Sequence, residues 1–493
     1  MKTQLSFFNR LGVYGFGQVE PLVIAALVSE DPVLLIGKAG TGKTFLLNSI
    51  SEAMGLVHRH YNASLISFDD LVGFPYPSAD GRTISFLPTP ATIWEAESVL
   101  VDELSRCKPE TQNKFFSVIH EKKIQGMPLL KLQYRWAAMN PIGFEADADE
   151  QYEGSNPLDQ ALADRFAMII EVPDWPELST RDQEAVIYPG GEAAVSDDAG
   201  SLKDFINRVK PVFELNILHP HAEIVTYARL ATTLMTEAGY RISPRRARLL
   251  ARNITALNCV AKEMGNILVE KERKALYKLV LRWSLPHRAW KGPVPEHVID
   301  AVHAEAARLA FSGSPKDLWI SEFLLAGDLT NKVPKLFEET IDIDTKSLAV
   351  IQLLAREQQG KAAIFSFCTY PILSEYMILN EEALNELARS AKGILKVDGE
   401  LKWRESYHDT GSNHPSLSVC MQTINKIPDT EEGRKKRARQ LILYLITQNI
   451  DIPEPDFVEE EMNNCFNTVK KYAAQLTNNE NGNGKKTWLF RRG

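Results

Sequence analysis

A glycine-rich run that ends in a lysine and a threonine is the strongest chemical feature of the sequence, and it reads Gly37-Lys-Ala-Gly-Thr-Gly-Lys43-Thr44. Glycines at this spacing let backbone N–H groups turn toward phosphate oxygens, while Lys43 supplies a point charge and Thr44 a hydroxyl for Mg²⁺. The run lies between the apolar segment 33–36 and an amphipathic segment, and a helix that begins there adds positive potential. This setting favours a phosphate-binding loop over the alternative, a glycine-rich surface turn. The residues predicted to contact the nucleotide here are Gly37, Lys38, Ala39, Gly40, Thr41, Gly42, Lys43, Thr44 and Phe45.

Two neighbouring carboxylates, Asp102 and Glu103, follow the apolar segment 98–101. Because α/β sheets place their ligands at strand ends, we expect Asp102 to hold the magnesium shell. Glu103 would point to the other side of the pleat and polarise the water that attacks a γ-phosphate. Acids at strand ends also cap helices, but a phosphate loop earlier in the chain favours the chemical interpretation.

A neutral amide, Asn140, ends the next apolar segment, 134–139. An amide can donate a hydrogen bond to phosphate and accept one from water, so Asn140 suits an orienting role in the same site. Taken alone, an asparagine in this position is more often a turn residue.

The elements that must position these side chains alternate in the order of βαβ units. We expect strands over 33–36, 56–61, 99–101 and 134–139, and helices over 43–54 and 109–121. This order predicts an α/β fold, with a mostly parallel sheet covered by helices on both faces. The carboxyl ends of its strands would then carry the phosphate loop, the acid pair and Asn140 along one edge.

Beyond the sheet the periodicity becomes helical, and the chain divides into five predicted parts. These are an α/β nucleotide-binding domain over 1–173, a linker or insertion over 174–222, a helical lid over 223–313, a mainly helical C-terminal domain over 314–476 and a flexible tail over 477–493. Within the C-terminal part, 364–368 has a β-like pattern. The basic run 434–439 is expected to be a solvated helix face, and a site for an acidic partner is the alternative.

Composition excludes several classes of protein. The 493 residues include 56 Lys and Arg and 64 Asp and Glu, a net charge of −8, which does not favour a protein that coats nucleic acid. The apolar runs are too short to span a bilayer, so no membrane anchor is expected. The cysteines (Cys107, Cys259, Cys368, Cys420 and Cys465) lack zinc-site spacing, which fits a reducing cytoplasm. The histidines His58, His60, His219 and His221 show no metal-ligand geometry and are expected to be structural.

Together these motifs resemble the MoxR-like branch of the AAA+ ATPases. The longest match is the stretch 153–166, which begins Glu-Gly, continues with Pro157-Leu158 and ends in Asp164-Arg165-Phe166. The residues Gly17, Gln18 and Val19 resemble the family segment that lies beside the adenine. The segments 69–73 and 81–87 resemble the hairpin that interrupts helix 2 in this clade; an ordinary exposed hairpin is the alternative.

The resemblance implies ATP and Mg²⁺ as cofactors and assigns further roles. Thr44 and Asp102 would hold the metal, with Asp102 and Glu103 as the Walker B pair and Asn140 as sensor 1. Arg165 would be the arginine finger and Arg245 the sensor 2 arginine, although by local physics alone they form a helix-end ion pair and a capped helix start. The sequence leaves open whether Arg245 faces its own nucleotide or a neighbour's, and whether Arg246 shares its role. The acidic segment 142–152 is longer than the family's and is expected to be a solvated loop.

The function implied by the resemblance is ATP-driven remodelling of a protein client by a homo-oligomeric ring, expected to be a hexamer. A protein with a von Willebrand factor A domain is the expected partner. The first alternative is an McrB-type NTPase directed to nucleic acid, whose pattern continues Met-Asn-Thr where this chain has Met139-Asn140-Pro141. A nucleotide-gated adaptor that hardly hydrolyses ATP would need a defective Glu103 or Arg165, and both residues are present.

Overall fold

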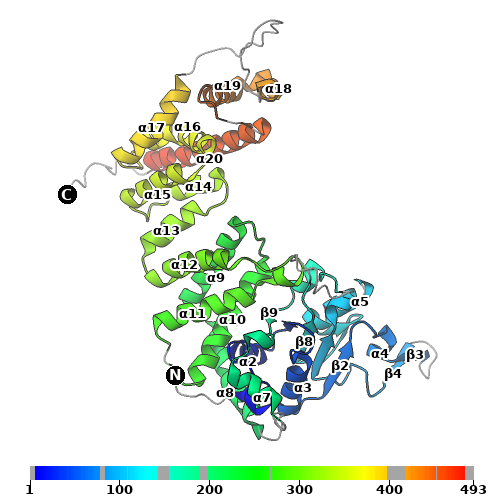
Figure 1. Ribbon diagram of the computed structural model, residues 1–493. Coiled ribbons are helices and arrows are strands. Elements are labelled where there is room, and N and C mark those ends of the chain that lie inside the picture. The colour runs from blue at the N-terminus through cyan, green and yellow to red at the C-terminus, as the bar shows by residue number, and fades with distance from the viewer. Residues whose placement is uncertain are drawn as a thin grey trace. The chain divides into compact units, whose positions relative to one another are not determined.

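The computed structural model describes residues 6–77, 84–107, 109–142, 155–188, 198–266, 268–396, 417–450, 452 and 454–482 (Figure 1). The chain forms two compact units, Met1–Gly313 and Ser314–Gly493. The boundary between them falls where the sequence places the start of the C-terminal domain. The stretch 153–166, which matches the family, falls within unit 1. Its first two residues, Glu153 and Gly154, lie outside the described residues, as does most of the acidic segment 142–152.

Unit 1 contains a five-stranded sheet in the order β2-β5-β8-β1-β9, and all four neighbouring pairs are parallel. The strands are β1 (Val33–Ile36), β2 (His58–Asn62), β5 (Ser98–Asp102), β8 (Tyr134–Met139) and β9 (Met168–Glu171). The α/β prediction is therefore confirmed, and the strand of this five-stranded sheet that it missed is β9. All four residues of β1 are buried, as expected for a central parallel strand with both faces covered.

Helices cover the sheet and connect its strands. They are α1 (Phe7–Arg10), α2 (Glu20–Ser29), α3 (Lys43–Ala53), α4 (Phe68–Val72), α5 (Pro109–Phe116) and α6 (Gln160–Ala163), and a π-helical turn extends α5 through Ser117–Glu121. The helix α3 packs on β2, β5 and β8. On the other face, alternate strand residues such as Leu34, Val99 and Val101 join Phe115 and Phe166 in one buried cluster. Alternation of the strand side chains thus fills both layers.

Two hairpins project from this domain. The first pairs β3 (Phe74–Pro77) with β4 (Ile84–Leu87), in the region that resembles the helix 2 insert. Gly73 enters it at φ +94°, where the Leu87 carbonyl approaches so closely that a Cβ atom would clash. Residues 78–83 between the two strands lie outside the described part of the chain. The second hairpin, β6 (Lys123–Ile124) with β7 (Met127–Pro128), was not predicted.

The segment predicted as a linker or insertion, 174–222, contains two helices. The rest of unit 1 consists of α7 (Thr180–Ile187), α8 (Ser201–Leu218), α9 (Ala222–Glu237), α10 (Pro244–Glu263), α11 (Glu270–Trp283) and α12 (Glu296–Ser312). The helix α8 buries Leu202, Phe205, Val209 and Phe213, which follow helical spacing, and it packs against α2 and α10. Helical periodicity after the sheet domain therefore already includes Ser201–Leu218, ahead of the predicted start at 223.

Unit 2 is helical throughout its described residues. Its helices are α13 (Pro315–Leu324), α14 (Leu329–Leu336), α15 (Ile343–Arg356), α16 (Gln359–Glu375), α17 (Glu381–Leu395), α18 (Leu417–Lys426), α19 (Glu432–Thr447) and α20 (Pro455–Gly482). The β-like structure predicted over 364–368 is wrong, because these residues form the middle of α16, where all of them are buried. A short apolar run cannot distinguish a buried strand from a buried helix. The predicted tail is helical as far as Gly482, and 483–493 lie outside the described residues.

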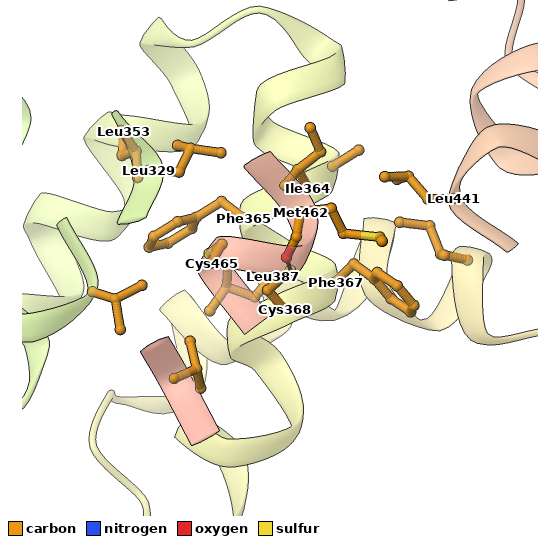
Figure 2. Close-up of a cluster of buried hydrophobic side chains, with 14 of the residues drawn as sticks. Leu329, Leu353, Ile364, Phe365, Phe367, Cys368, Leu387, Leu441, Met462 and Cys465 are labelled. Carbon is orange, nitrogen blue, oxygen red and sulfur yellow. Dashed lines mark hydrogen bonds between the residues drawn. The ribbon is translucent and has the colours of Figure 1, made fainter. Parts of the chain in front are cut away.

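One hydrophobic core holds unit 2 together (Figure 2). It combines Phe365 and Cys368 of α16 with Leu387 of α17 and with Met462 and Cys465 of α20.

All five cysteines of the chain are buried free thiols. Along the described residues of both units, no helix has the length and apolar character needed to cross a bilayer.

The basic run 434–439 is less solvated than predicted. Arg434 donates two hydrogen bonds to the buried Glu459, at 2.8 and 2.7 Å, and Arg437 lies 3.9 Å over the ring of Phe466. These contacts tie α19 to α20. The run therefore serves in part as a packing surface within unit 2.

We expect Phe365→Ala to lower the local stability of unit 2 by about 3–5 kcal/mol, because it removes a fully buried ring. In the full chain, hydrogen exchange of amides in α16 and α20 should accelerate by about a hundredfold or more, while amides of β1 and β8 keep their rates. Leu348→Ala, at a residue 48% exposed in α15, is the control and should change stability by less than about 0.5 kcal/mol. Equal effects of the two substitutions would contradict the assignment of this core.

Candidate functional site

The carboxyl ends of three adjacent strands bring the predicted site residues together. Strand β1 leads into the glycine-rich loop, β5 ends at Asp102 and β8 ends just before Asn140, and the sheet order places β8 between the other two. Since all three strands are parallel, these residues lie along one edge of the sheet, where α/β folds bind ligands.

The glycine-rich loop curls around the Lys43 ammonium. Gly40 and Gly42 both have φ +81°, the left-handed conformation that favours glycine. Lys43 Nζ donates to the carbonyls of Gly37 and Lys38, each at 2.7 Å, and lies 3.5 Å from Asn140 Oδ1. Burial lowers the Lys43 pKa, whereas the nearby charges of Asp102 and Glu103 oppose that shift. The loop thus concentrates positive charge beside the Asn140 amide.

The other residues of the loop lie around this charge. Thr41 Oγ1 donates to the Lys38 carbonyl at 2.8 Å, Lys38 forms an ion pair with Asp174 at 3.3 Å, and the side chain of Phe45 is exposed at the start of α3. Ala39 is exposed as well.

The segment that resembles the family's adenine contact precedes α2. Val19 is buried there, whereas Gly17 and Gln18 are exposed, and nothing lies within 4 Å of the place where a Gly17 side chain would start. Two residues earlier, a side chain at Gly15 would clash with Leu178. The segment around Gly15 therefore packs against the segment around Leu178. Asp174, the ion-pair partner of Lys38, lies shortly before Leu178 in the chain.

Thr44 and Asp102 form a ready oxygen pair. Thr44 Oγ1 donates to Asp102 Oδ2 at 2.8 Å, and the Glu103 amide donates to Asp102 Oδ1 at 2.8 Å. Burial alone would raise the Asp102 pKa, but hydrogen bonds from His60, Thr44 and the Glu103 amide lower it on balance. A hydroxyl beside an ionised carboxylate fits Mg²⁺, which takes oxygen ligands and keeps several waters.

Glu103 has a left-handed backbone, with φ 55°, directly after β5. A non-glycine residue in this region is strained by about 1 kcal/mol or more, and such strain concentrates at functional sites. The Glu103 carboxylate lies 3.2 Å from Arg106 Nε and close enough to Lys43 to affect its pKa. Asp102 is therefore the last residue of β5, and the backbone turns out of the strand at Glu103.

Arg165 and Arg245 lie at the opposite edge of the sheet. The Ala167 amide donates to the Pro32 carbonyl at 2.8 Å, and Met168 pairs with Val33, so the residues just before β9 lie at the amino end of β1. A strand of four residues separates the two edges by roughly 13 Å. The structure does not bring Arg165 or Arg245 to the phosphate loop of their own chain.

The two arginines instead form one arginine cluster, in which Asp164, Glu121 and Asp159 lie near enough to offset part of the positive charge. Arg245 Nη1 donates to Asp164 Oδ2 at 2.9 Å, and Ser243 Oγ donates to the same carboxylate. Arg165 lies 4.6 Å over the Phe116 ring, and its buried Nε has no hydrogen-bond partner among the described residues. Burial lowers the Arg165 pKa, and repulsion by Arg245 adds to the shift. The cluster is suited to receive an anion.

Arg246 does not share this role. Only 2% of its surface is exposed, and it donates to the carbonyls of Phe166 and Ala167. Burial lowers the Arg246 pKa to about 10. The residue is part of the packing between α10 and the sheet.

One histidine that the motifs do not include lies beside the site. His60, expected to be structural, lies with its Nε2 atom 3.3 Å from Asp102 Oδ2. The signal was available, because His60 lies near the end of a predicted strand whose neighbour ends in the acid pair. His58 fits the structural interpretation, since it contacts Ser98 and Asn48 and burial lowers its pKa to about 4.

Known proteins resemble part of the chain. Residues 32–166 match the family described as "AAA domain (dynein-related subfamily)". The uncharacterized protein YojN of Bacillus subtilis is 33% identical over 176 residues, which are 34% of this chain and 57% of that protein. The uncharacterized protein YeaC of the same species is 27% identical over 164 residues, 32% of this chain and 47% of that protein. The chain thus spans about half the length of the curated relatives it matches.

Among solved structures, a crystal structure described as a "putative ATPase" from Cytophaga hutchinsonii covers 60% of this chain and 92% of its own. Its sequence identity is 20% and its TM-score 0.41. The family match and the site geometry agree. Residues 32–166 therefore form an AAA+ ATPase domain of the P-loop class, and membership of the MoxR-like branch stays a prediction.

We expect Lys43→Ala to weaken ATP binding at least tenfold, about 1.4 kcal/mol, because it removes the charge that faces the phosphates. Isothermal titration of the full chain measures this effect. Lys271→Ala, an exposed lysine in α11, is the control and should keep the wild-type affinity. Equal affinities of the Lys43→Ala variant and the wild type would contradict the phosphate-loop assignment.

Proposed function

We propose that this protein binds ATP with Mg²⁺ and hydrolyses it at sites shared between neighbouring copies of the chain. The observation that carries the proposal is the separation of the phosphate loop from Arg165 and Arg245, which lie at opposite ends of the parallel strands. An arginine that stabilises a transferred phosphoryl group must reach it within hydrogen-bond distance. In this arrangement, Arg165 and Arg245 could serve only a nucleotide that is bound to a neighbouring chain.

Each residue at the carboxyl edge has a role that its position supports. Lys43 and the loop amides would bind the phosphates, and Thr44 and Asp102 would hold Mg²⁺, which supplies charge neutralisation when bound. Glu103 would accept the proton of the attacking water, and Asn140 would orient that water or the γ-phosphate. The Gly17–Val19 segment would border the adenine.

A head-to-tail contact would let every chain give its arginine cluster and receive another. A contact of this kind joins two different surfaces, and it closes into a ring when the rotation permits. We expect six chains in that ring. Both Arg165 and Arg245 would then act on the neighbour's nucleotide, since Asp164 holds Arg245 at the same edge as Arg165.

Remodelling of a protein client in the cytoplasm is the work that we propose for the hydrolysis cycle, with a von Willebrand factor A domain protein as partner. Two features support it. Unit 2 is a separate helical body with its own core, and the β3–β4 hairpin exposes Phe74 and Tyr76. The acidic chain and Pro141, which follows Asn140, disfavour the McrB-type alternative.

We expect Arg165→Ala and Glu103→Gln each to bind ATP normally and to lose hydrolysis by about a hundredfold or more. A 1:1 mixture should recover up to about a quarter of the wild-type activity, because some contacts then pair an intact arginine with an intact glutamate. Steady-state phosphate release measures all three samples.

The control is Arg389→Ala, at a residue in unit 2 whose side chain is 76% exposed, and it should keep full activity. An inactive mixture in which mixed oligomers demonstrably form would contradict shared sites.

A further inference from the structure

His60 reaches the proposed magnesium site from the edge strand β2. In the parallel pairing of β2 with β5, His60 lies beside Leu100 and Asn62 beside Asp102. The imidazole therefore extends diagonally along the sheet, and its Nε2 atom lies 3.3 Å from Asp102 Oδ2. The side chain of His60 is 38% exposed and that of Asp102 only 16%.

Three donors surround the Asp102 carboxylate. The Glu103 amide donates to Oδ1, and the Thr44 hydroxyl and His60 Nε2 share Oδ2. An ionised carboxylate only accepts hydrogen bonds, so Nε2 of His60 must carry the proton that it donates. Rotation about the last torsion of an aspartate is soft, and donors on both oxygens are what restrain it.

We propose that His60 is a positioning residue for Mg²⁺, holding the Asp102 carboxylate so that it and Thr44 present their oxygens to the metal together. The inference rests on the proposed function, because it concerns the metal that accompanies ATP. Thr44 has one hydroxyl proton, which it gives to Asp102, and this leaves its lone pairs for the metal. His60 supplies the second hydrogen bond to Oδ2, from the side of β2.

The contrast with His58 separates this role from packing. His58 lies two residues earlier on the same strand face, but its two nitrogens contact Ser98 and Asn48 and it does not touch Asp102. It is the more buried of the two and belongs to the layer between β2 and α3. Since His60 is partly exposed, its substitution should leave that layer intact. Partners that orient a metal ligand typically contribute about 10- to 100-fold to metal affinity.

The test compares His60→Asn with His60→Gln. The Gln amide nitrogen occupies nearly the place of His Nε2, whereas the Asn amide nitrogen is one carbon closer to the backbone and cannot reach Asp102. Isothermal titration with AMP-PNP, a non-hydrolysable ATP analogue, gives the affinity with Mg²⁺ and with EDTA. The ratio of the two affinities measures the metal's contribution.

We expect His60→Asn to reduce this ratio about tenfold or more and to leave the affinity in EDTA within about threefold of wild type. His60→Gln should keep the ratio within about threefold of wild type. Melting temperatures check the fold, and His60→Ser replaces His60→Asn if the latter does not fold.

Three results would overturn the inference. These are an unchanged ratio in His60→Asn, an equal loss in His60→Gln, or a parallel loss with and without Mg²⁺, which indicates a structural role. If the wild type itself shows no affinity for AMP-PNP, the proposed function fails as well. The two failures are therefore distinguishable.

Discussion

Parallel pairing of β1 with β8 on one side and with β9 on the other is the constraint on which the rest of the site depends. In register, Ile36 lies beside Met139 and Glu171, so the chain leaves β1 and β8 at the same edge and enters β9 at the opposite one. The phosphate loop follows β1 directly, and Arg165 precedes β9. No rotation of side chains can change which edge each group occupies, because the backbone hydrogen bonds fix it.

Helix α10 is bound to the amino edge by a set of polar contacts. Arg252 donates to Asp31 at 2.6 Å and to the Ser29 carbonyl at 2.8 Å, both just before β1. Asn253, fully buried, donates to the Ala167 carbonyl at 3.0 Å, and Arg245 pairs with Asp164. Buried polar groups are costly unless paired, so these bonds fix the lid helix to the ends of β1 and β9. A displacement of α10 would therefore act on β1, the strand that leads into the phosphate loop.

The sequence predicted the parts of the molecule that local patterns determine. Residues 33–36 and 134–139 are strands with the predicted bounds, and the chemistry of the glycine-rich loop followed from its spacing. What it could not show depends on pairing between distant segments. The helix α8 is an exception, because its buried residues do follow a local helical spacing, yet it lies in the segment predicted as a linker or insertion. The short apolar run of β9 gave no signal of its own.

Pairing between distant segments also determines which of the predicted site residues lie together. The motifs named Arg165, Arg245 and Asp102, but only the register of β9 on β1 shows that the arginines lie at the other edge, and only the pairing of β2 with β5 brings His60 to Asp102. Arg246 and Arg245 are neighbours in sequence, yet one is buried on backbone carbonyls and the other pairs with Asp164 at 37% side-chain exposure. Helical geometry separates them in a way that composition does not reveal.

Under the proposed function, one chain holds only part of an ATP site. The most direct measurement is the specific ATPase activity as a function of protein concentration, with the molar mass in ATP determined by light scattering on the same samples. Shared sites predict that activity per chain rises in step with assembly and falls toward zero where the protein is monomeric. A constant activity per chain, maintained by monomers at high dilution, would contradict the account.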